Sequence, residues 1–135
     1  MPSDGRVSLR LMSVRPLILC ADDDEDILAL VALRLERAGY DVACVGDGEA
    51  AVALAAQRRP DAVVLDMMLP RRSGIEVLAE LRSHPGLTGT KVLLLSARVQ
   101  EGDVARGLDA GADAFLAKPF RATELVERIE QLLAA

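Results

Sequence analysis

The chain has 135 residues, of which 16 are basic and 21 are acidic, so its net charge is −5. This length suits one domain of ordinary core size, and the acidic balance excludes a general attraction to nucleic acid or to an anionic membrane. At 51% hydrophobic residues the composition excludes disorder, and the apolar runs are far shorter than the ~20 residues that span a bilayer. Two cysteines are too few for a disulfide scaffold, so a reducing cytoplasm is expected.

After a polar start, short apolar runs alternate with stretches of helical spacing. Residues 1–14 are predicted to form a flexible leader, followed by one domain over 15–135. The runs predicted as strands are 16–21, 41–45, 62–65, 91–95 and 114–117. The stretches predicted as helices are 25–38, 48–57, 74–82, 99–110 and 123–133.

Local signals mark the ends of several predicted helices. Acidic residues at 22–26 favour the start of the first helix through its dipole. Gly39 and Gly111 follow the first and fourth helices, where glycine commonly ends a helix. Thr123 is placed to cap the amino end of the last helix.

The hydrophobic pattern of the strands predicts the layering of the fold. The runs 17–20, 62–65 and 92–95 are continuously apolar, which indicates strands buried on both faces. Five strands alternating with five helices predict an α/β fold, a flavodoxin-like (βα)5 doubly wound parallel sheet with strand order 2-1-3-4-5. Ligands of such sheets bind beyond the carboxyl ends of the strands, so the residues that follow each strand are the candidates for function.

Polar and charged residues stand at these strand ends. Asp22 and Asp23 follow the first strand, Asp66 the third, Ser96 the fourth and Lys118 the fifth. If the sheet forms as predicted, these side chains share one pocket. Clustered carboxylates repel one another unless a cation lies among them, and hard oxygen ligands suit Mg²⁺.

A carboxylate beside Mg²⁺ and an ammonium group can attack a phosphoryl group and form an aspartyl phosphate. Asp66 is the candidate for that attack, with Lys118 neutralising charge on the phosphoryl oxygens and Ser96 donating to one of them. A lysine at position 118 is informative, because the 16 basic residues include only one other lysine, Lys91. Taken singly, Ser96 is uninformative and Asp66 could be a turn former. The acidic residues at 24–26 are more simply a solvated helix start.

Four segments resemble the receiver domains of bacterial two-component response regulators. They read ILCADDD at 18–24, VVLDMMLP at 63–70, LLSAR at 94–98 and GADAFLAKPF at 111–120. Ser73 and Gly74, shortly after the second segment, belong to the same pattern. The likeness covers about 16–133 and is strongest to receivers of the winged-helix class.

The resemblance implies a metal-binding and phosphoacceptor role for residues at the strand ends. Asp66 would be the phosphoacceptor. Asp23 and Asp66 would bind Mg²⁺ directly, together with the backbone carbonyl of Met68. Asp22 would act through a water molecule.

The resemblance also implies how the phosphoryl group is held and what it changes. Ser96 and Lys118 would hold the group, the Lys118–Pro119 bond would be cis, and the donor would be a histidine kinase or a histidine phosphotransfer protein. Phosphorylation would draw Ser96 inward and let Phe115 rotate. That movement would alter the surface of the fourth helix, fifth strand and fifth helix for partner binding. Ordinary packing of Phe115 against the last two helices is compatible with this role.

Two positions near the phosphoacceptor predict a long-lived phosphoryl group. Met68, two residues after Asp66, and Arg98, two residues after Ser96, flank the approach of hydrolytic water. An apolar Met68 cannot orient that water, and by resemblance this pair is frequent in the winged-helix class. His84 lies in a Ser-His-Pro-Gly loop and is given no part in phosphotransfer.

Receivers of the winged-helix class dimerise through charged pairs on the same output surface. Five residues fit that pattern here: Arg106, Asp109, Asp113, Glu124 and Arg128. Val104 stands where the class usually has a basic residue, and Ala114 where it usually has an acid. We therefore expect a monomer or a weak phosphorylation-dependent dimer.

Three other functions fit parts of the sequence. An unphosphorylated pseudo-receiver would act as an interaction scaffold, but it would be expected to lack an acid, Ser96 or Lys118. A phosphatase with an aspartyl intermediate would need a second acid at position 68, where methionine cannot transfer a proton. Flavin or nucleotide binding would need a glycine-rich loop. No enzyme activity is therefore expected, and the downstream partner is another protein or an output domain outside this chain.

Overall fold

Five parallel strands form one sheet in the order β2-β1-β3-β4-β5, which confirms the predicted topology. The strands are β1 (Leu17–Ala21), β2 (Asp41–Val45), β3 (Ala62–Asp66), β4 (Lys91–Ser96) and β5 (Ala114–Ala117). Each observed bound lies within one residue of the predicted one. The structure, a computed structural model, describes residues 15–97 and 101–135, so the predicted leader at 1–14 lies outside the described residues.

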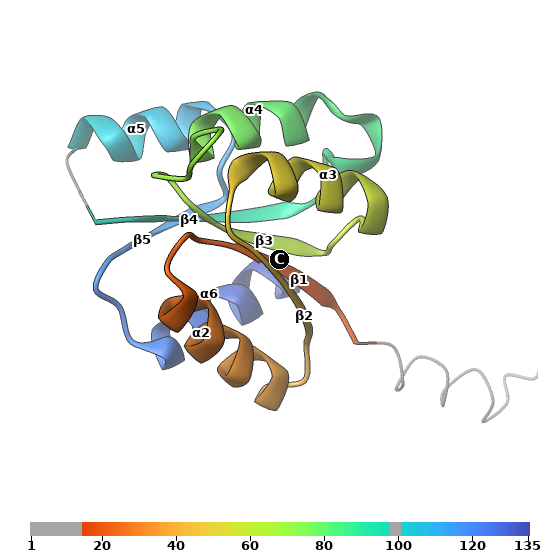
Figure 1. The fold of residues 1–135 in the computed structure, drawn as a ribbon, viewed down its shortest axis with the longest axis vertical. Helices are drawn as coiled ribbons and strands as arrows, with labels where there is room; N and C mark the ends of the chain where they lie inside the picture. The colour runs from red at the N-terminus through yellow and green to blue at the C-terminus, as the bar shows by residue number, and fades with distance from the viewer. Residues whose placement is uncertain (1–14, 98–100) are drawn as a thin grey trace, which may run out of the picture.

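Helices cover both faces of the sheet (Figure 1). One face carries α3 (Gly48–Arg58), α4 (Gly74–Ser83) and α5 (Glu101–Asp109), and the other carries α2 (Glu25–Arg37) and α6 (Ala122–Ala134). A short 3-10 helix, η1 (Pro85–Leu87), follows α4. The doubly wound arrangement is therefore as predicted. Within the described part of the chain, no helix combines the length and the apolar character that crossing a membrane requires.

β3 is the central strand, and all five of its residues are buried. Val63 and Leu65 pack with the cluster under α3 and α4, while Ala62 and Val64 pack with the cluster under α2 and α6. Each residue of the strand therefore meets one of the two helix layers, which is why the run is continuously apolar. This packing holds the last residue of the strand, Asp66, at a fixed level of the sheet.

The predicted helix ends are confirmed at the two glycines and wrong at Thr123. Gly39 and Gly111 both adopt a φ of 107°, the left-handed region that glycine reaches without strain. Helix α6 begins one residue before Thr123, with Arg121 at the N-cap position. The carboxylate of Glu124 accepts a hydrogen bond from the Arg121 N–H at 3.2 Å, so an acid inside the first turn satisfies the helix end.

Gly74 brings the start of α4 against the carboxyl end of β3. Its N–H donates to the carbonyl oxygen of Met67 at 2.9 Å. A Cβ at this position would lie 2.5 Å from the carbonyl oxygen of Asp66 and 2.7 Å from the Cα of Met67. Only a residue without a side chain permits this approach, so Gly74 fixes the backbone on which Asp66 stands.

Replacing Gly74 by alanine is expected to lower the free energy of unfolding by about 1–3 kcal/mol, because the added methyl group would push backbone against backbone. Gly102 in α5 is the matched control, since nothing lies within 4 Å of a Cβ built there. Gly102→Ala should leave stability unchanged or raise it by up to about 1 kcal/mol. Urea unfolding measures both variants, and equal stabilities would contradict the close approach at Gly74.

Candidate functional site

The carboxyl ends of four strands meet at one edge of the sheet. Asp66 ends β3 and is the register partner of Leu95 in β4, while Ser96 ends β4 and is the register partner of Ala117 in β5. Asp22 directly follows β1, and Lys118 directly follows β5. The strand ends therefore converge as the sequence predicts.

Lys118 joins two of the acidic side chains. Its Nζ donates to Asp22 Oδ2 at 2.7 Å and to Asp66 Oδ2 at 2.8 Å. Its backbone N–H donates to the carbonyl oxygen of Ser96 at 2.7 Å, and the Lys118–Pro119 bond is cis, as expected. One ammonium group therefore connects the ends of β1, β3 and β5.

Backbone amides hold the remaining oxygens of the two buried acids. Asp22 and Asp66 are 2% and 4% exposed, so any oxygen left unpaired would be costly. Asp22 Oδ1 accepts from the Asp24 N–H at 3.0 Å, and Asp66 Oδ1 accepts from the Met68 N–H at 3.0 Å. Each carboxylate is therefore bound on one side by Lys118 and on the other by the chain itself.

Three carboxylates at this edge form a donor set that fits a divalent cation. Oxygens of Asp22, Asp23 and Asp66 all lie within 4.8 Å of one another, and Asp23 is exposed to solvent. Hard oxygen ligands with an open side suit Mg²⁺, which retains several water molecules. Direct ligation by Asp23 and Asp66, water-mediated ligation by Asp22 and a contact from the Met68 carbonyl stay predictions.

The cluster holds more acidic than basic side chains, with three carboxyl groups around one lysine. Burial raises the pKa of Asp66, and the charge of Asp22 adds to that rise, whereas hydrogen bonds from Lys118 and the Met68 amide oppose it. Burial alone would lower the pKa of Lys118, but its hydrogen bonds to Asp22 and Asp66 outweigh burial and raise that pKa. Lys118 therefore stays protonated among three acidic side chains, and a bound cation would offset the negative charge that remains.

The two predicted switch residues lie on neighbouring strands. Ser96 is 4% exposed at the end of β4, and Phe115 is half-buried in β5. The Phe115 ring lies on the α5 side, where a Cβ on Gly107 would be 3.7 Å from it. The expected packing against both last helices is thus corrected, because strand alternation turns the ring to one face only. α6 contacts its backbone, since Arg128 donates to the Phe115 carbonyl at 3.1 Å.

The two residues expected to control hydrolysis are only partly described. Met68 is 70% exposed, so its side chain borders solvent next to the phosphoacceptor candidate. Arg98 lies outside the described residues. The tuning of hydrolysis by this pair therefore stays a prediction.

Asp113, one residue of the expected dimer pattern, is engaged within the chain. Asp113 Oδ2 accepts from Arg82 Nη2 at 2.8 Å and from the Val92 N–H at 2.8 Å. Arg82 also donates to the carbonyl oxygens of Gly111 and Thr90, so it ties the end of α4 to two loops. No sequence pattern indicated this contact, which joins positions 31 residues apart.

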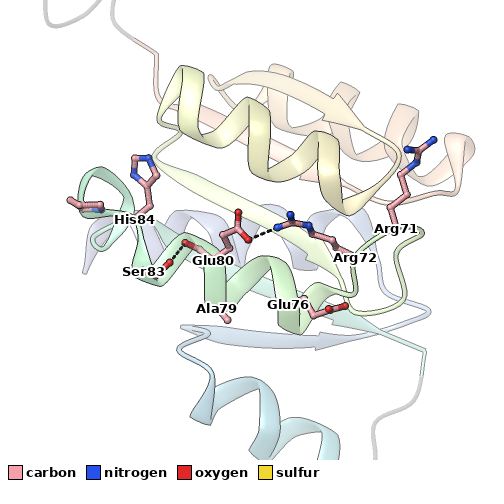
Figure 2. A pocket seen from close by; sticks show the side chains of 8 residues that line it. Arg71, Arg72, Glu76, Ala79, Glu80, Ser83 and His84 are labelled. Carbon is pink, nitrogen blue, oxygen red and sulfur yellow. Dashed lines mark hydrogen bonds and ion pairs between the residues drawn. The ribbon is translucent and has the colours of Figure 1, made fainter.

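A hollow lies away from the acid cluster, along the outer side of α4 (Figure 2). It measures about 910 Å³, and its arginines have acidic partners: Arg72 pairs with Glu80, and Arg71 pairs with Glu49 at 3.6 Å. His84, at its far end, accepts a hydrogen bond from the Gly86 N–H at 3.3 Å and so helps form η1. The chemistry of the strand ends, not the size of this hollow, identifies the site.

Sequence reasoning missed the part that Asp24 plays beside the cluster. Asp24 is the N-cap of α2, and its side chain accepts from the N–H groups of Asp26 and Ile27. The available signal was an aspartate directly before an apolar run of helical spacing. Because Asp24 also donates to Asp22, it belongs to the surroundings of the site.

The fold is a doubly wound α/β sheet with an acid cluster at the carboxyl ends of its strands, and comparison with known proteins identifies the family. A family model described as the response regulator receiver domain matches residues 18–130. The chain therefore belongs to this family and is a receiver domain of two-component response regulators. Such domains are typically signalling modules rather than enzymes.

Curated relatives agree with the predicted subclass. The chain is 42% identical over 116 residues to the alkaline phosphatase synthesis transcriptional regulatory protein PhoP of Bacillus subtilis (strain 168), covering 86% of this chain and 48% of that protein. It is 43% identical over 127 residues to the probable transcriptional regulatory protein TcrX of Mycobacterium tuberculosis, covering 93% and 53%. These are regulators of the PhoP type, which confirms the likeness to the winged-helix class. The chain spans about half the length of the curated relatives it matches.

Solved structures agree with the fold. A putative response regulator from Chloroflexus aurantiacus J-10-fl superposes with a TM-score of 0.85 at 34% identity, covering 90% of this chain and all of that one. The receiver domain of DrrB, in a structure described as BeF3 activated, has a TM-score of 0.81 at 32% identity, covering 90% and 100%. Both likenesses extend over nearly the whole described domain.

Removing the charge of Asp66 is expected to stabilise the domain when no metal is present. The raised pKa means that folding favours the protonated carboxyl group. Ionisation of Asp66 therefore lowers the free energy of unfolding. The loss begins as the pH rises past the ordinary aspartate pKa of about 3.9 and is complete above the raised pKa of the folded state. Asparagine removes the charge and keeps an oxygen that can accept from Lys118 or the Met68 amide.

Urea unfolding in chelator measures this effect. The free energy of unfolding of Asp66→Asn should exceed that of the wild type at about pH 7, and the difference should shrink toward about pH 3. Added Mg²⁺ should then stabilise the wild type more than the variant. A variant less stable than the wild type at neutral pH would contradict the expected direction.

Proposed function

We propose that Asp66 accepts a phosphoryl group from a histidine kinase or a histidine phosphotransfer protein, with Mg²⁺ held by Asp22, Asp23 and Asp66. The observation that carries the proposal is the contact of the Lys118 ammonium with both Asp22 and Asp66, at 2.7 and 2.8 Å. The buried acid thus lies beside a fixed positive charge and at the edge of a three-carboxylate donor set. This combination suits nucleophilic attack by a carboxylate on a phosphoryl group.

In the proposed step an oxygen of Asp66 attacks the phosphorus of a phosphohistidine. The new O–P bond forms while the N–P bond breaks, and the imidazole nitrogen leaves with the electron pair and takes up a proton. Lys118 then donates to a phosphoryl oxygen, which it can do because its ammonium already touches Asp66 Oδ2. Bound Mg²⁺ would supply further neutralisation of the phosphoryl charge.

The response to phosphorylation is proposed to run through Ser96 and Phe115. A phosphoryl group adds three acceptor oxygens, and Ser96 ends the strand next to Asp66. Ser96 moves toward the phosphoryl group, and Phe115 on the adjacent strand turns into the space that this movement opens. Because the Phe115 ring lies against α5 near Gly107, its rotation changes the α5–β5–α6 surface.

The lifetime and readout of the signal follow from the same proposal. An exposed, apolar Met68 leaves hydrolytic water without a partner on that side of the phosphoryl group, and Arg98 completes the pair expected to slow hydrolysis. Because the curated relatives are transcriptional regulators about twice as long as this chain, the changed surface acts on an output domain or on a separate protein. The domain acts in the cytoplasm, as a monomer or a weak phosphorylation-dependent dimer.

Incubation with Mg²⁺ and acetyl phosphate, a small phosphodonor, should add one phosphoryl group per chain, visible in the intact mass. Asp66→Asn should abolish the gain because asparagine lacks the attacking carboxylate. Asp61→Asn is the matched control: Asp61 stands just before the opposite end of β3, where it accepts from the Leu17 N–H. That variant should gain the phosphoryl group as the wild type does.

Other outcomes of this experiment point to the alternatives. Equal labelling of the wild type and Asp66→Asn would contradict the assignment of the phosphoacceptor. No labelling and no Mg²⁺ binding by the wild type would favour an unphosphorylated scaffold. Sustained release of many phosphates per chain from small substrates would favour a phosphatase.

A further inference from the structure

Asp24 joins the acidic cluster to the first turn of α2. Its Oδ1 accepts from the backbone N–H groups of Asp26 at 3.0 Å and Ile27 at 3.2 Å, and its carbonyl accepts from the Leu28 N–H at 3.1 Å. Its own N–H donates to Asp22 Oδ1 at 3.0 Å. Asp24 therefore caps α2 and also closes the turn that holds Asp22 and Asp23.

Asp22 is held at three points, one of which Asp24 supplies. The Asp22 N–H donates to the carbonyl oxygen of Val45 at 3.2 Å, and its Oδ2 accepts from Lys118 at 2.7 Å. The bond from Asp24 fixes the other carboxylate oxygen. Without that bond the carboxylate could rotate about the contact with Lys118.

Asp23 depends on its neighbours for its direction. Within the described residues, no hydrogen bond or ion pair holds its exposed carboxylate, although one oxygen lies within 4.8 Å of oxygens from Asp22 and Asp66. Its backbone runs between Asp22, anchored on the sheet, and Asp24, anchored on the helix. The position of the Asp23 carboxylate is therefore set by the two anchored residues on either side.

We infer that Asp24 is a positioning residue for the metal site, acting through Asp22 and Asp23 by its hold on the first turn of α2. It is not itself one of the three clustered acids. The inference rests on the proposed Mg²⁺ site and assigns Asp24 more than the solvated helix start expected from the sequence. Because the cap already orders this turn before the metal binds, metal binding costs less conformational entropy.

Isothermal titration of the purified chain with Mg²⁺ tests the inference without relying on phosphorylation. Asp24→Ala should weaken Mg²⁺ binding about fivefold, the factor expected if a typical N-cap contribution is coupled to binding. Asp24→Asn removes the charge but keeps a side-chain oxygen that caps well, so its Kd should stay within about twofold of the wild type. The pair separates the capping oxygen from the negative charge.

Asp47 supplies the matched control, because it caps α3 in the same way. Its Oδ1 accepts from the Ala50 N–H at 2.7 Å, and it is not among the three clustered acids. Asp47→Ala should lower the thermal unfolding temperature about as much as Asp24→Ala but leave the Kd for Mg²⁺ unchanged. If Asp24→Ala does not fold, Asp24→Gly carries the test, since glycine replaces a cap at small cost in stability but has no side-chain oxygen, and its Kd for Mg²⁺ should exceed that of Asp24→Asn.

Each outcome decides between the inference and the proposed function. Equal weakening by Asp24→Ala and Asp47→Ala, or by Asp24→Ala and Asp24→Asn, would overturn the positioning role. So would a wild-type Kd in Asp24→Ala. A wild-type chain that binds no Mg²⁺ would contradict the proposed function itself, whereas normal wild-type binding with an unaffected variant would remove only the role of Asp24.

Discussion

The reach of one lysine side chain across the sheet organises the functional end of this domain. β4 lies between β3 and β5, and adjacent strands are about 4.8 Å apart, so a group on β5 must cross the end of β4 to touch Asp66. Lys118 has the length for this crossing, and the residue at the end of β4, Ser96, is small. The Lys118 side chain therefore passes the end of β4, whose last residue is Ser96, to reach Asp66.

The same contact lets a buried acid exist at the edge of an apolar sheet. Burial raises the pKa of Asp66, so its ionised form opposes folding unless partners compensate. The ammonium group of Lys118 and the amide of Met68 supply two such partners, and the Met68 amide is in place because Gly74 lets α4 pack against the end of β3. In the proposed function, a bound cation and a phosphoryl group would supply the further compensation that this buried carboxylate lacks without them.

Strand content and the location of the site could be predicted because they depend on local patterns. The apolar run of β3 reflects burial between two helix layers, and Asp66 is the first charged residue after it. Gly39 and Gly111 end helices because their backbone adopts positive φ, which glycine tolerates. The family resemblance added roles to these residues, while the parallel topology alone brought them to one edge.

The errors arose at three positions where the local sequence signal admitted more than one contact. Thr123 looked like a cap because its side chain suits one, but Glu124 satisfies the helix end one residue earlier. Phe115 was expected to pack against both last helices, although strict alternation along β5 gives a side chain access to only one face. Asp24 had a capping signature but no sequence signal that its amide would bind Asp22.

The internal contacts of Asp113 bear on how two such domains could associate through the α5–β5–α6 surface. The Asp113 carboxylate accepts from Arg82 and from the Val92 amide at 2.8 Å each, so a partner's basic residue would compete with two bonds already made. Replacing an internal ion pair by an intermolecular one gains little free energy at a partly exposed site. Among the described residues, the same surface also carries an exposed large apolar side chain, Leu108 on α5. A change in the position of α5, to which the Phe115 ring is packed, would move that residue directly.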